Sequence, residues 1–280
     1  MQPLWSRKVA APPRGLSLAR ERGCLLVWEA DHGLHLFNRA GEPQASVRTA
    51  DAVIDACCAD DGETFAAMGA GGQVWLLAPD LTPRWERTAP PRGTAVALDP
   101  FGQYLAAADG DGGLSLFDRN GRMHWRIANA RPLRQLAFIP ERPALAATAD
   151  FGLTACFDLS GKVLWRDGPM AHVGSLAVSG DGATIALACF SDGLHCYSLD
   201  GPKRRCLEGA GPCRLAAVSY DGDAFLTADL GQRLHLRDAA GRERGDWTLE
   251  AVPVGLALGA TGEDAVVVLA DGRILAWRTA

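Results

Sequence analysis

Several common signatures are missing from this sequence of 280 residues. No apolar run approaches the ~20 residues that a bilayer-spanning helix needs, and residues 1–8 show no apolar stretch after their charges, as a secretory signal would. The eight cysteines form no Cys-x-x-Cys pair. We therefore expect a cytoplasmic protein without membrane insertion, whose cysteines stay reduced and pack as small core residues.

A strong charge of one sign is missing too. The 28 Lys and Arg residues and the 33 Asp and Glu residues give a formal net charge of −5, and the two signs are interspersed along the chain. This pattern predicts no basic stripe that could follow a phosphate backbone, so we expect no nucleic acid partner. The 48% of hydrophobic residues predict a globular protein with a sizeable core.

What the sequence does contain is a repeat. Tryptophans recur at whole multiples of 40 residues, at Trp5, Trp85, Trp125 and Trp165. Glycines keep the same period, at Gly62, Gly102, Gly182, Gly222 and Gly262. A period of this length indicates one supersecondary unit copied along the chain, each copy too small to bury its own apolar face alone.

Residues 173–201 show the repeating unit most clearly. Apolar runs at 173–178, 183–190 and 194–197 are separated by turns that contain Asp and Gly. Short β-rich runs punctuated in this way predict an antiparallel meander, because glycine supplies the positive φ of tight hairpins. A fourth strand is predicted at 122–127 and 162–166 in the preceding copies. We name the four strands a, b, c and d.

Seven copies are predicted from the turns between strands b and c. Aligning these turns selects Gly33, Gly72, Gly113, Gly152, Gly193, Gly231 and Gly272. The last copy has only three strands, whereas residues 4–9 resemble a fourth strand without a preceding partner. Joining the two ends completes a ring without open sheet edges. The sequence thus predicts an all-β protein, a single seven-bladed β-propeller over 1–280, with blades near 12–50, 51–91, 92–130, 131–170, 171–208, 209–251, and 252–280 plus 1–11.

The repeat resembles those of two families of propellers. Strand c ends in Phe117-Asp118 and Phe157-Asp158, which resemble the Trp-Asp pair of WD40 repeats, although the Gly-His dipeptide of that family is missing. Residues 118–125 and 158–165 also resemble the Asp-x-x-(Thr)-Gly-x-x-x-Trp motif of quinoprotein-like (PQQ-like) propellers. That resemblance implies that each tryptophan packs against the neighbouring blade. In two other copies the tryptophan of this motif is replaced, by Ala45 and by Arg205.

Two side-chain groups could suggest a cofactor or a metal. The quinoprotein resemblance implies a vicinal disulfide for the adjacent Cys57 and Cys58, but we interpret them as packing residues and expect no cofactor. The histidines His35, His195 and His235 occupy equivalent positions in strand c. Because equivalent positions of different blades are held apart by the ring, we expect no metal site there.

Arginines gather at one predicted end of the channel. The d-to-a and b-to-c connections emerge on one face, and that face carries Arg14, Arg92, Arg131, Arg134 and Arg214, with Asp55 and Gln135 next to them. Arginine with a mixed polar rim is typical of a docking surface. The alternative is that these arginines only keep the loops soluble.

We therefore predict a non-enzymatic WD40-like interaction scaffold, a monomeric propeller within a larger complex that binds one or more proteins or peptides at this channel rim. The alternative is a metal-dependent hydrolase, lactonase or lyase with its site at the central channel. No Gly-x-Ser-x-Gly elbow occurs, and the slots that face the mouth contain one carboxylate and no histidine. We assign no catalytic residue.

Overall fold

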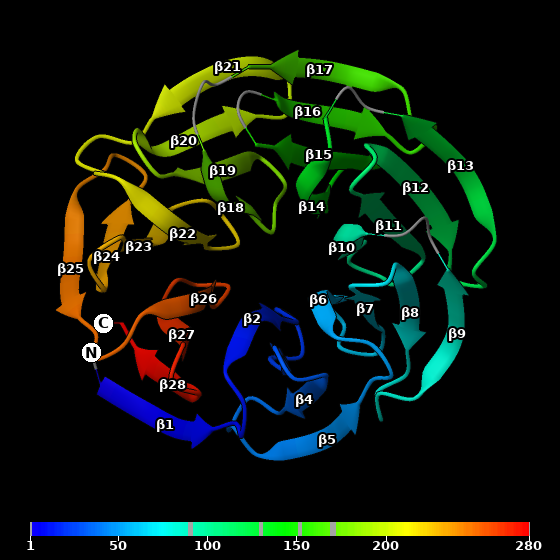
Figure 1. The fold of residues 1–280 in the computed structure, drawn as a ribbon. Coiled ribbons are helices and arrows are strands. Elements are labelled where there is room, and N and C mark those ends of the chain that lie inside the picture. The colour runs from blue at the N-terminus through cyan, green and yellow to red at the C-terminus, as the bar shows by residue number, and fades with distance from the viewer. Residues whose placement is uncertain (1, 89–91, 129–130, 151–152, 169–171, 280) are drawn as a thin grey trace.

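The computed structural model describes residues 2–88, 92–128, 131–150, 153–168 and 172–279. In these residues the chain forms the strands β1 to β28 and no helix. The strands build seven sheets of four antiparallel strands each, arranged as a ring around a central channel (Figure 1). The predicted seven-bladed propeller is confirmed.

The first four blades follow each other in chain order, each running from the channel outward. Blade one contains β2 (Pro13–Leu18), β3 (Leu25–Glu29), β4 (Gly33–Phe37) and β5 (Pro43–Arg48). Blade two contains β6 (Val53–Cys58), β7 (Phe65–Gly69), β8 (Gln73–Leu77) and β9 (Pro83–Thr88). Blade three contains β10 (Gly93–Leu98), β11 (Tyr104–Asp109), β12 (Gly113–Asp118) and β13 (Met123–Ala128). Blade four contains β14 (Leu133–Ile139), β15 (Ala144–Ala149), β16 (Leu153–Asp158) and β17 (Val163–Asp167).

The remaining blades complete the ring. Blade five contains β18 (Val173–Val178), β19 (Thr184–Cys189), β20 (Gly193–Ser198) and β21 (Gly201–Cys206). Blade six contains β22 (Cys213–Val218), β23 (Ala224–Asp229), β24 (Arg233–Asp238) and β25 (Glu243–Thr248). Blade seven contains β26 (Pro253–Leu258), β27 (Asp264–Leu269), β28 (Arg273–Arg278) and, as its outer strand, β1 (Gln2–Lys8).

Blade seven closes the ring as predicted. Strand β1 pairs antiparallel with β28, with Trp5 opposite Ala276 and Lys8 opposite Arg273. The N–H of Val9 continues the ladder to the carbonyl of Gly272 at 3.0 Å. The two ends of the chain therefore lie close together in one blade (Figure 1).

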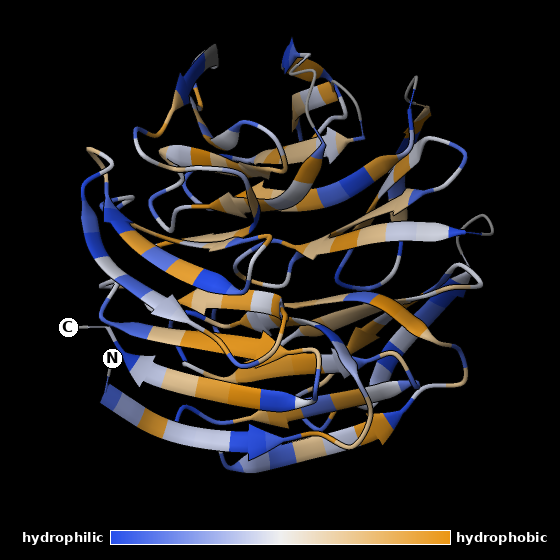
Figure 2. Ribbon diagram, turned by 60° about the vertical axis from the view of Figure 1, so that its left-hand side comes forward, coloured by the Kyte–Doolittle hydropathy of each residue, from blue (hydrophilic) through white to orange (hydrophobic). Residues whose placement is uncertain are grey.

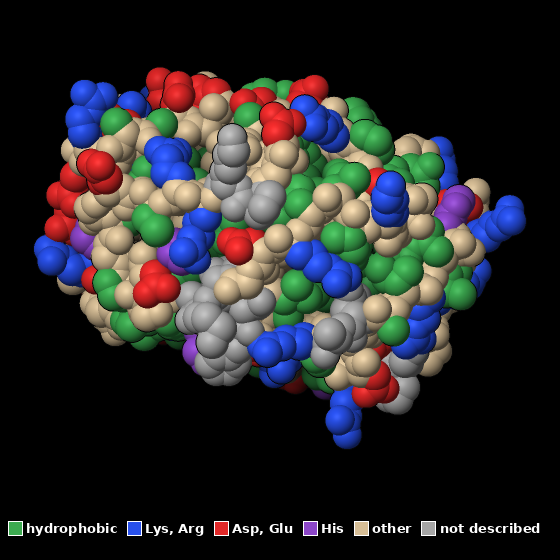
Figure 3. All heavy atoms as spheres, turned by 90° about the horizontal axis from the view of Figure 1, so that it is seen from above, with side chains coloured by type: hydrophobic (Ala, Val, Ile, Leu, Met, Phe, Trp, Pro, Cys, Tyr) green, Lys and Arg blue, Asp and Glu red, His purple; other side chains and the backbone are tan. Residues whose placement is uncertain are grey.

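The core lies between blades and follows from the strand pattern. The middle strands are almost continuously apolar and buried, whereas the outer strands alternate between exposed and half-buried residues (Figure 2). Alanine is frequent in the inner three strands and lets the sheets approach each other. Around β17 and β21, Lys and Arg side chains lie among Asp and Glu (Figure 3). Every blade thus has an apolar interior and a charged rim.

Tryptophans on the outer strands lock neighbouring blades together, as the quinoprotein resemblance implied. Each indole Nε1 donates to a carbonyl in the c-to-d turn of the next blade: Trp5 to Arg39 at 3.0 Å, Trp85 to Arg119 at 3.1 Å, Trp125 to Leu159 at 2.7 Å and Trp165 to Leu199 at 3.2 Å. The turn residues Gly41 and Gly121 have positive φ and no side chain that could collide with the ring of Trp5 or Trp85.

Three outer strands lack this tryptophan, at Ala45, Arg205 and Gly245, and at the first two another residue takes over its role. Arg205 stands in the tryptophan position and its Nη1 donates to the carbonyl of Ala239 at 2.7 Å, the same kind of turn carbonyl. At Ala45 of blade one, the space of the missing indole is filled by a side chain from blade two. Leu81 occupies the turn position that is glycine elsewhere, with φ of 63° and 1% exposure, and Ala45 packs against the cluster that contains it. The leucine fills space that a tryptophan at position 45 would need.

This exchange predicts a compensating pair of substitutions. Ala45→Trp alone overpacks the junction, and Leu81→Gly alone removes a buried leucine, so we expect each to lower the free energy of unfolding by about 1–3 kcal/mol. The double variant restores the arrangement of the other junctions and should recover most of that loss. Urea unfolding of all four proteins measures the coupling. Strict additivity of the two single effects would refute the exchange.

The b-to-c turns differ in one respect from the prediction. The positive φ falls on the residue immediately before strand c in blades one, three and six: His32, Gly112 and Gln232. Gly33 and Gly113 begin their strands instead. The carboxylates of Glu29 and Asp109 occupy the space that a Cβ at these two positions would need and that glycine leaves free. The predicted turn residue Gly152 lies outside the described residues.

Candidate functional site: the axial channel

The seven inner strands surround a channel with a cavity at each end. One of about 490 Å³ opens toward the d-to-a crossovers, and one of about 250 Å³ opens toward the a-to-b turns. Small residues occupy the middle of the wall, at Ala97, Ala137, Ala177, Ala217 and Ala257. Crowding of seven strands near one axis leaves little room for larger side chains there.

Polar side chains in the wall form hydrogen bonds with backbone groups of the neighbouring inner strand that have no partner in a sheet. Ser175 Oγ accepts from the N–H of Ala216 at 2.7 Å, and Ser17 Oγ accepts from the N–H of Cys58 at 3.2 Å. Gln135 Nε2 donates to the carbonyl of Gly174 at 2.7 Å. An inner strand has no partner on its channel side, so these bonds join consecutive blades.

Asp55 makes the same kind of bond with a carboxylate. Its Oδ2 accepts from the N–H of Val96 at 2.9 Å and its Oδ1 from the N–H of Ala56 at 3.0 Å. The surrounding protein removes water from the carboxyl group, and this desolvation raises its pKa to about 7 despite the two N–H donors. Asp55 is thus a titratable group inside the channel.

The predicted arginines surround the wider opening. Arg14 and Arg134 line its cavity together with Asp55 and Gln135. Arg92 and Arg131 are exposed in the crossovers, and Arg214 is half-buried at the start of β22. We call this set of Arg14, Arg92, Arg131, Arg134 and Arg214 the arginine mouth.

Members of the arginine mouth differ in their partners. Arg134 Nε lies 3.1 Å from Asp150 Oδ2, and Arg131 donates to the carbonyl of Asp150 at 3.2 Å. Within the described part of the chain, the guanidinium groups of Arg14, Arg92 and Arg214 make no hydrogen bond or ion pair. Many arginines elsewhere do have such contacts: Arg7 with Gly41, Arg87 with Gly121, Arg126 with Asp109, Arg233 with Asp246 and Arg273 with Glu250.

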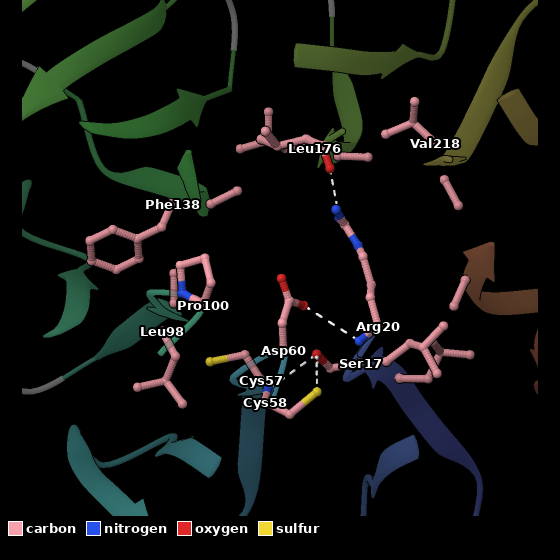
Figure 4. Close-up of a pocket in the computed structure, with 18 of the residues that line it drawn as sticks. Ser17, Arg20, Cys57, Cys58, Asp60, Leu98, Pro100, Phe138, Leu176 and Val218 are labelled. Carbon is pink, nitrogen blue, oxygen red and sulfur yellow. Dashed lines mark hydrogen bonds between the residues drawn. The ribbon is translucent and has the colours of Figure 1, made fainter. Parts of the chain in front are cut away.

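Sequence reasoning missed the opposite opening of the channel. Arg20, in the a-to-b turn of blade one, reaches across the channel, and its Nη2 donates to the carbonyl of Val178 in blade five at 2.6 Å (Figure 4). Asp60 points into the same cavity (Figure 4), and burial raises the pKa of its carboxyl group against the opposing charge of Arg20. The only sequence signal is that charged residues occupy a repeat position held by proline at Pro100 and Pro140.

The structure places the adjacent cysteines and the three equivalent histidines at separate points of the ring. Cys57 and Cys58 are free thiols whose sulfur atoms point in different directions (Figure 4), and burial raises both pKa values. His35, His195 and His235 lie on β4, β20 and β24, in three different blades. Over the described ranges, no three His, Cys, Asp or Glu side chains are grouped closely enough to hold a metal ion.

Comparison with known proteins leaves the fold as the basis for classification. No protein-family model matches the chain. No curated protein matches its sequence. In the described residues, no helix is long and apolar enough to span a membrane. The chain is a seven-bladed β-propeller with a polar channel, and its function has to be argued from that channel and from its surface.

Proposed function

We propose that this propeller is a non-enzymatic interaction platform that binds the acidic groups of a protein partner at the arginine mouth. The observation that carries the proposal is the lack of described partners for Arg14, Arg92 and Arg214. Guanidinium groups without internal acceptors keep all their donors available, and carboxylates accept two parallel hydrogen bonds from such a group.

The rigidity of the ring and the apolar residues nearby support this proposal. Loops on a stiff scaffold are where recognition is usually placed. On the same face, the b-to-c turns expose Phe190 by 39% and Leu230 by 59%. Arginines beside exposed aromatic and aliphatic side chains have the composition of interfaces that depend on a few strong contacts.

The finer classification belongs to the same proposal. The tryptophan contacts between blades favour kinship with quinoprotein-like repeats over WD40 repeats, because the indole-to-turn bond recurs at four junctions. A cytoplasmic location is supported by eight free cysteines, since thiols persist in a reducing compartment. Both statements concern origin and location and do not alter the binding surface.

Charge reversal in the arginine mouth tests the proposal. Arg14→Glu with Arg214→Glu breaks no described internal bond, so the fold should persist while acidic groups are repelled. We expect a stoichiometric partner captured by the tagged wild type from its native host to be depleted at least tenfold with the double variant. Quantitative mass spectrometry measures the depletion.

The matched control is Arg244→Glu on the outer strand β25, where the arginine is exposed and far from the channel. It should retain the same partner as the wild type. Identical sets of captured proteins for the wild type, the control and the double variant would show that the arginine mouth is not the binding surface.

A further inference from the structure

A further cavity lies outside the channel, on the face of the a-to-b turns, opposite the arginine mouth. It opens between blade seven and blade one, has a volume of about 730 Å³, and is lined mostly by apolar surface. Ligand sites in proteins span roughly 300–1,000 Å³ and combine apolar walls with few polar groups. We call it the closure pocket and define it by Leu4, Trp5, Leu18, Val266, Arg39 and Arg278.

The closure pocket lies at a junction where the a-to-b turns of the two blades are not joined by a backbone bond among the described residues. At other junctions the a-to-b turns of neighbouring blades are joined by backbone bonds, such as Asp60 N to Pro100 O at 2.9 Å and Tyr220 N to Ala260 O at 2.8 Å. Proline removes the donor at two further junctions, at Pro100 and Pro140. Ala260 has an N–H, yet among the described residues it makes no bond to the turn of blade one.

The floor of the closure pocket is apolar and partly open. Leu18 of β2 and Val266 of β27 pack against the core cluster between the two blades and remain half-buried. Leu4 on β1 is 44% exposed at the edge. Trp5 forms a rigid wall, because its indole is fixed by the bond to the carbonyl of Arg39. An apolar side chain from outside would cover this surface and displace water.

The edge of the closure pocket is positive. Arg39 and Arg278 share a single carboxylate, Asp264, at 3.4 Å and 3.6 Å. Their side chains remain 79% and 53% exposed, whereas the guanidinium group of Arg20, which also lines the pocket, extends across the channel to Val178. Two arginines against one aspartate leave a net positive charge at the edge of an apolar floor. The complementary ligand combines a bulky apolar group with negative charge.

From this combination we propose that the closure pocket binds an extended peptide segment of a partner protein, in which a leucine or aromatic side chain stands next to acidic residues. The apolar side chain lies on Leu18 and Val266, and the adjacent carboxylates pair with Arg39 and Arg278. Because this site is on the face opposite the arginine mouth, it does not depend on the function proposed above.

A peptide selection tests this site. We would select a phage-displayed library of random dodecapeptides against the full chain, label an enriched peptide with fluorescein, and measure binding by fluorescence anisotropy. Enriched sequences should join apolar and acidic residues. Leu4→Glu and Arg39→Glu place negative charge at the edge, and we expect each to weaken binding at least tenfold.

Two controls separate the possible outcomes. Arg244→Glu should bind the peptide within twofold of the wild type, and so should the arginine-mouth double variant. Thermal unfolding of Leu4→Glu and Arg39→Glu establishes that both proteins remain folded; both positions are exposed. The proposal is overturned if no peptide is enriched, if enriched peptides lack acidic residues, or if Leu4→Glu and Arg39→Glu bind normally. Loss of binding only in the arginine-mouth variant also overturns it and assigns the peptide to that mouth.

Discussion

Deletion of residues 2–8 should abolish the cooperative unfolding transition of the propeller. These residues form β1, which supplies the whole outer partner of β28 and carries Trp5 onto blade one. Without them, β28 presents unpaired backbone groups, and a sheet edge of this kind pairs with other chains. We expect calorimetry to show a broad transition at lower temperature and light scattering to show association.

Point substitutions separate the two contributions of β1, its pairing with β28 and the contact of Trp5 with blade one. Ser6→Ala keeps the strand and should leave the transition unchanged, since Ser6 is exposed. Trp5→Ala keeps the ladder and removes only the contact with blade one, so an intermediate loss of about 2–4 kcal/mol is expected for this half-buried tryptophan. A truncated protein that stays monomeric and unfolds at the wild-type temperature would contradict the closure.

The second large effect concerns pH and Asp55. Its carboxyl pKa is about 7 in the folded chain and close to its ordinary value of 3.8 when unfolded. The folded state therefore holds the proton more tightly, and this stability is complete below about pH 4 and is lost as the pH rises toward 7. The full difference corresponds to on the order of 4 kcal/mol.

Asp55→Ser is the matched variant, because Ser175 makes the same bond in blade five without a charge. The unfolding free energy of the wild type minus that of the variant should fall between pH 4 and pH 8, as measured by urea unfolding. For Asp118→Asn the same difference should stay nearly constant between pH 5 and pH 8 and fall only below about pH 4, because the N–H of Arg122 and other donors lower the pKa of Asp118. A carboxyl carbon of Asp55 that titrates near pH 4 in NMR spectra would refute the assignment.

Much of the fold was predictable because each blade repeats one local pattern. The 40-residue spacing of Trp85, Trp125 and Trp165 reflects one indole contact that recurs between successive blades, so sequence and geometry share the same period. The closure followed from counting strands. The lapse at Ala45 could be seen but not explained, because its compensation at Leu81 lies in another blade.

The channel and the pocket were less predictable. Arg20 contacts Val178 across the ring, and a separation of 158 residues leaves no periodic signal. The closure pocket lies at a junction where Ala260 makes no described backbone bond to the next turn, and sequence alone does not reveal this, because any residue except proline can make that bond. The arginines of the mouth could be assigned to one face from topology alone, but which of them lack internal partners depended on the positions of Asp150 and its neighbours.

The side-chain bonds along the channel wall all run in the same direction around the ring. Side chains of blades one to five each reach the following blade: Ser17 to Cys58, Asp55 to Val96, Thr94 to Leu133, Gln135 to Gly174 and Ser175 to Ala216. Excising one of the blades two to five would remove both a side chain that reaches forward and the backbone group that the preceding blade reaches. Removal of one of these blades would therefore change the channel-wall bonds at the junctions on both of its sides.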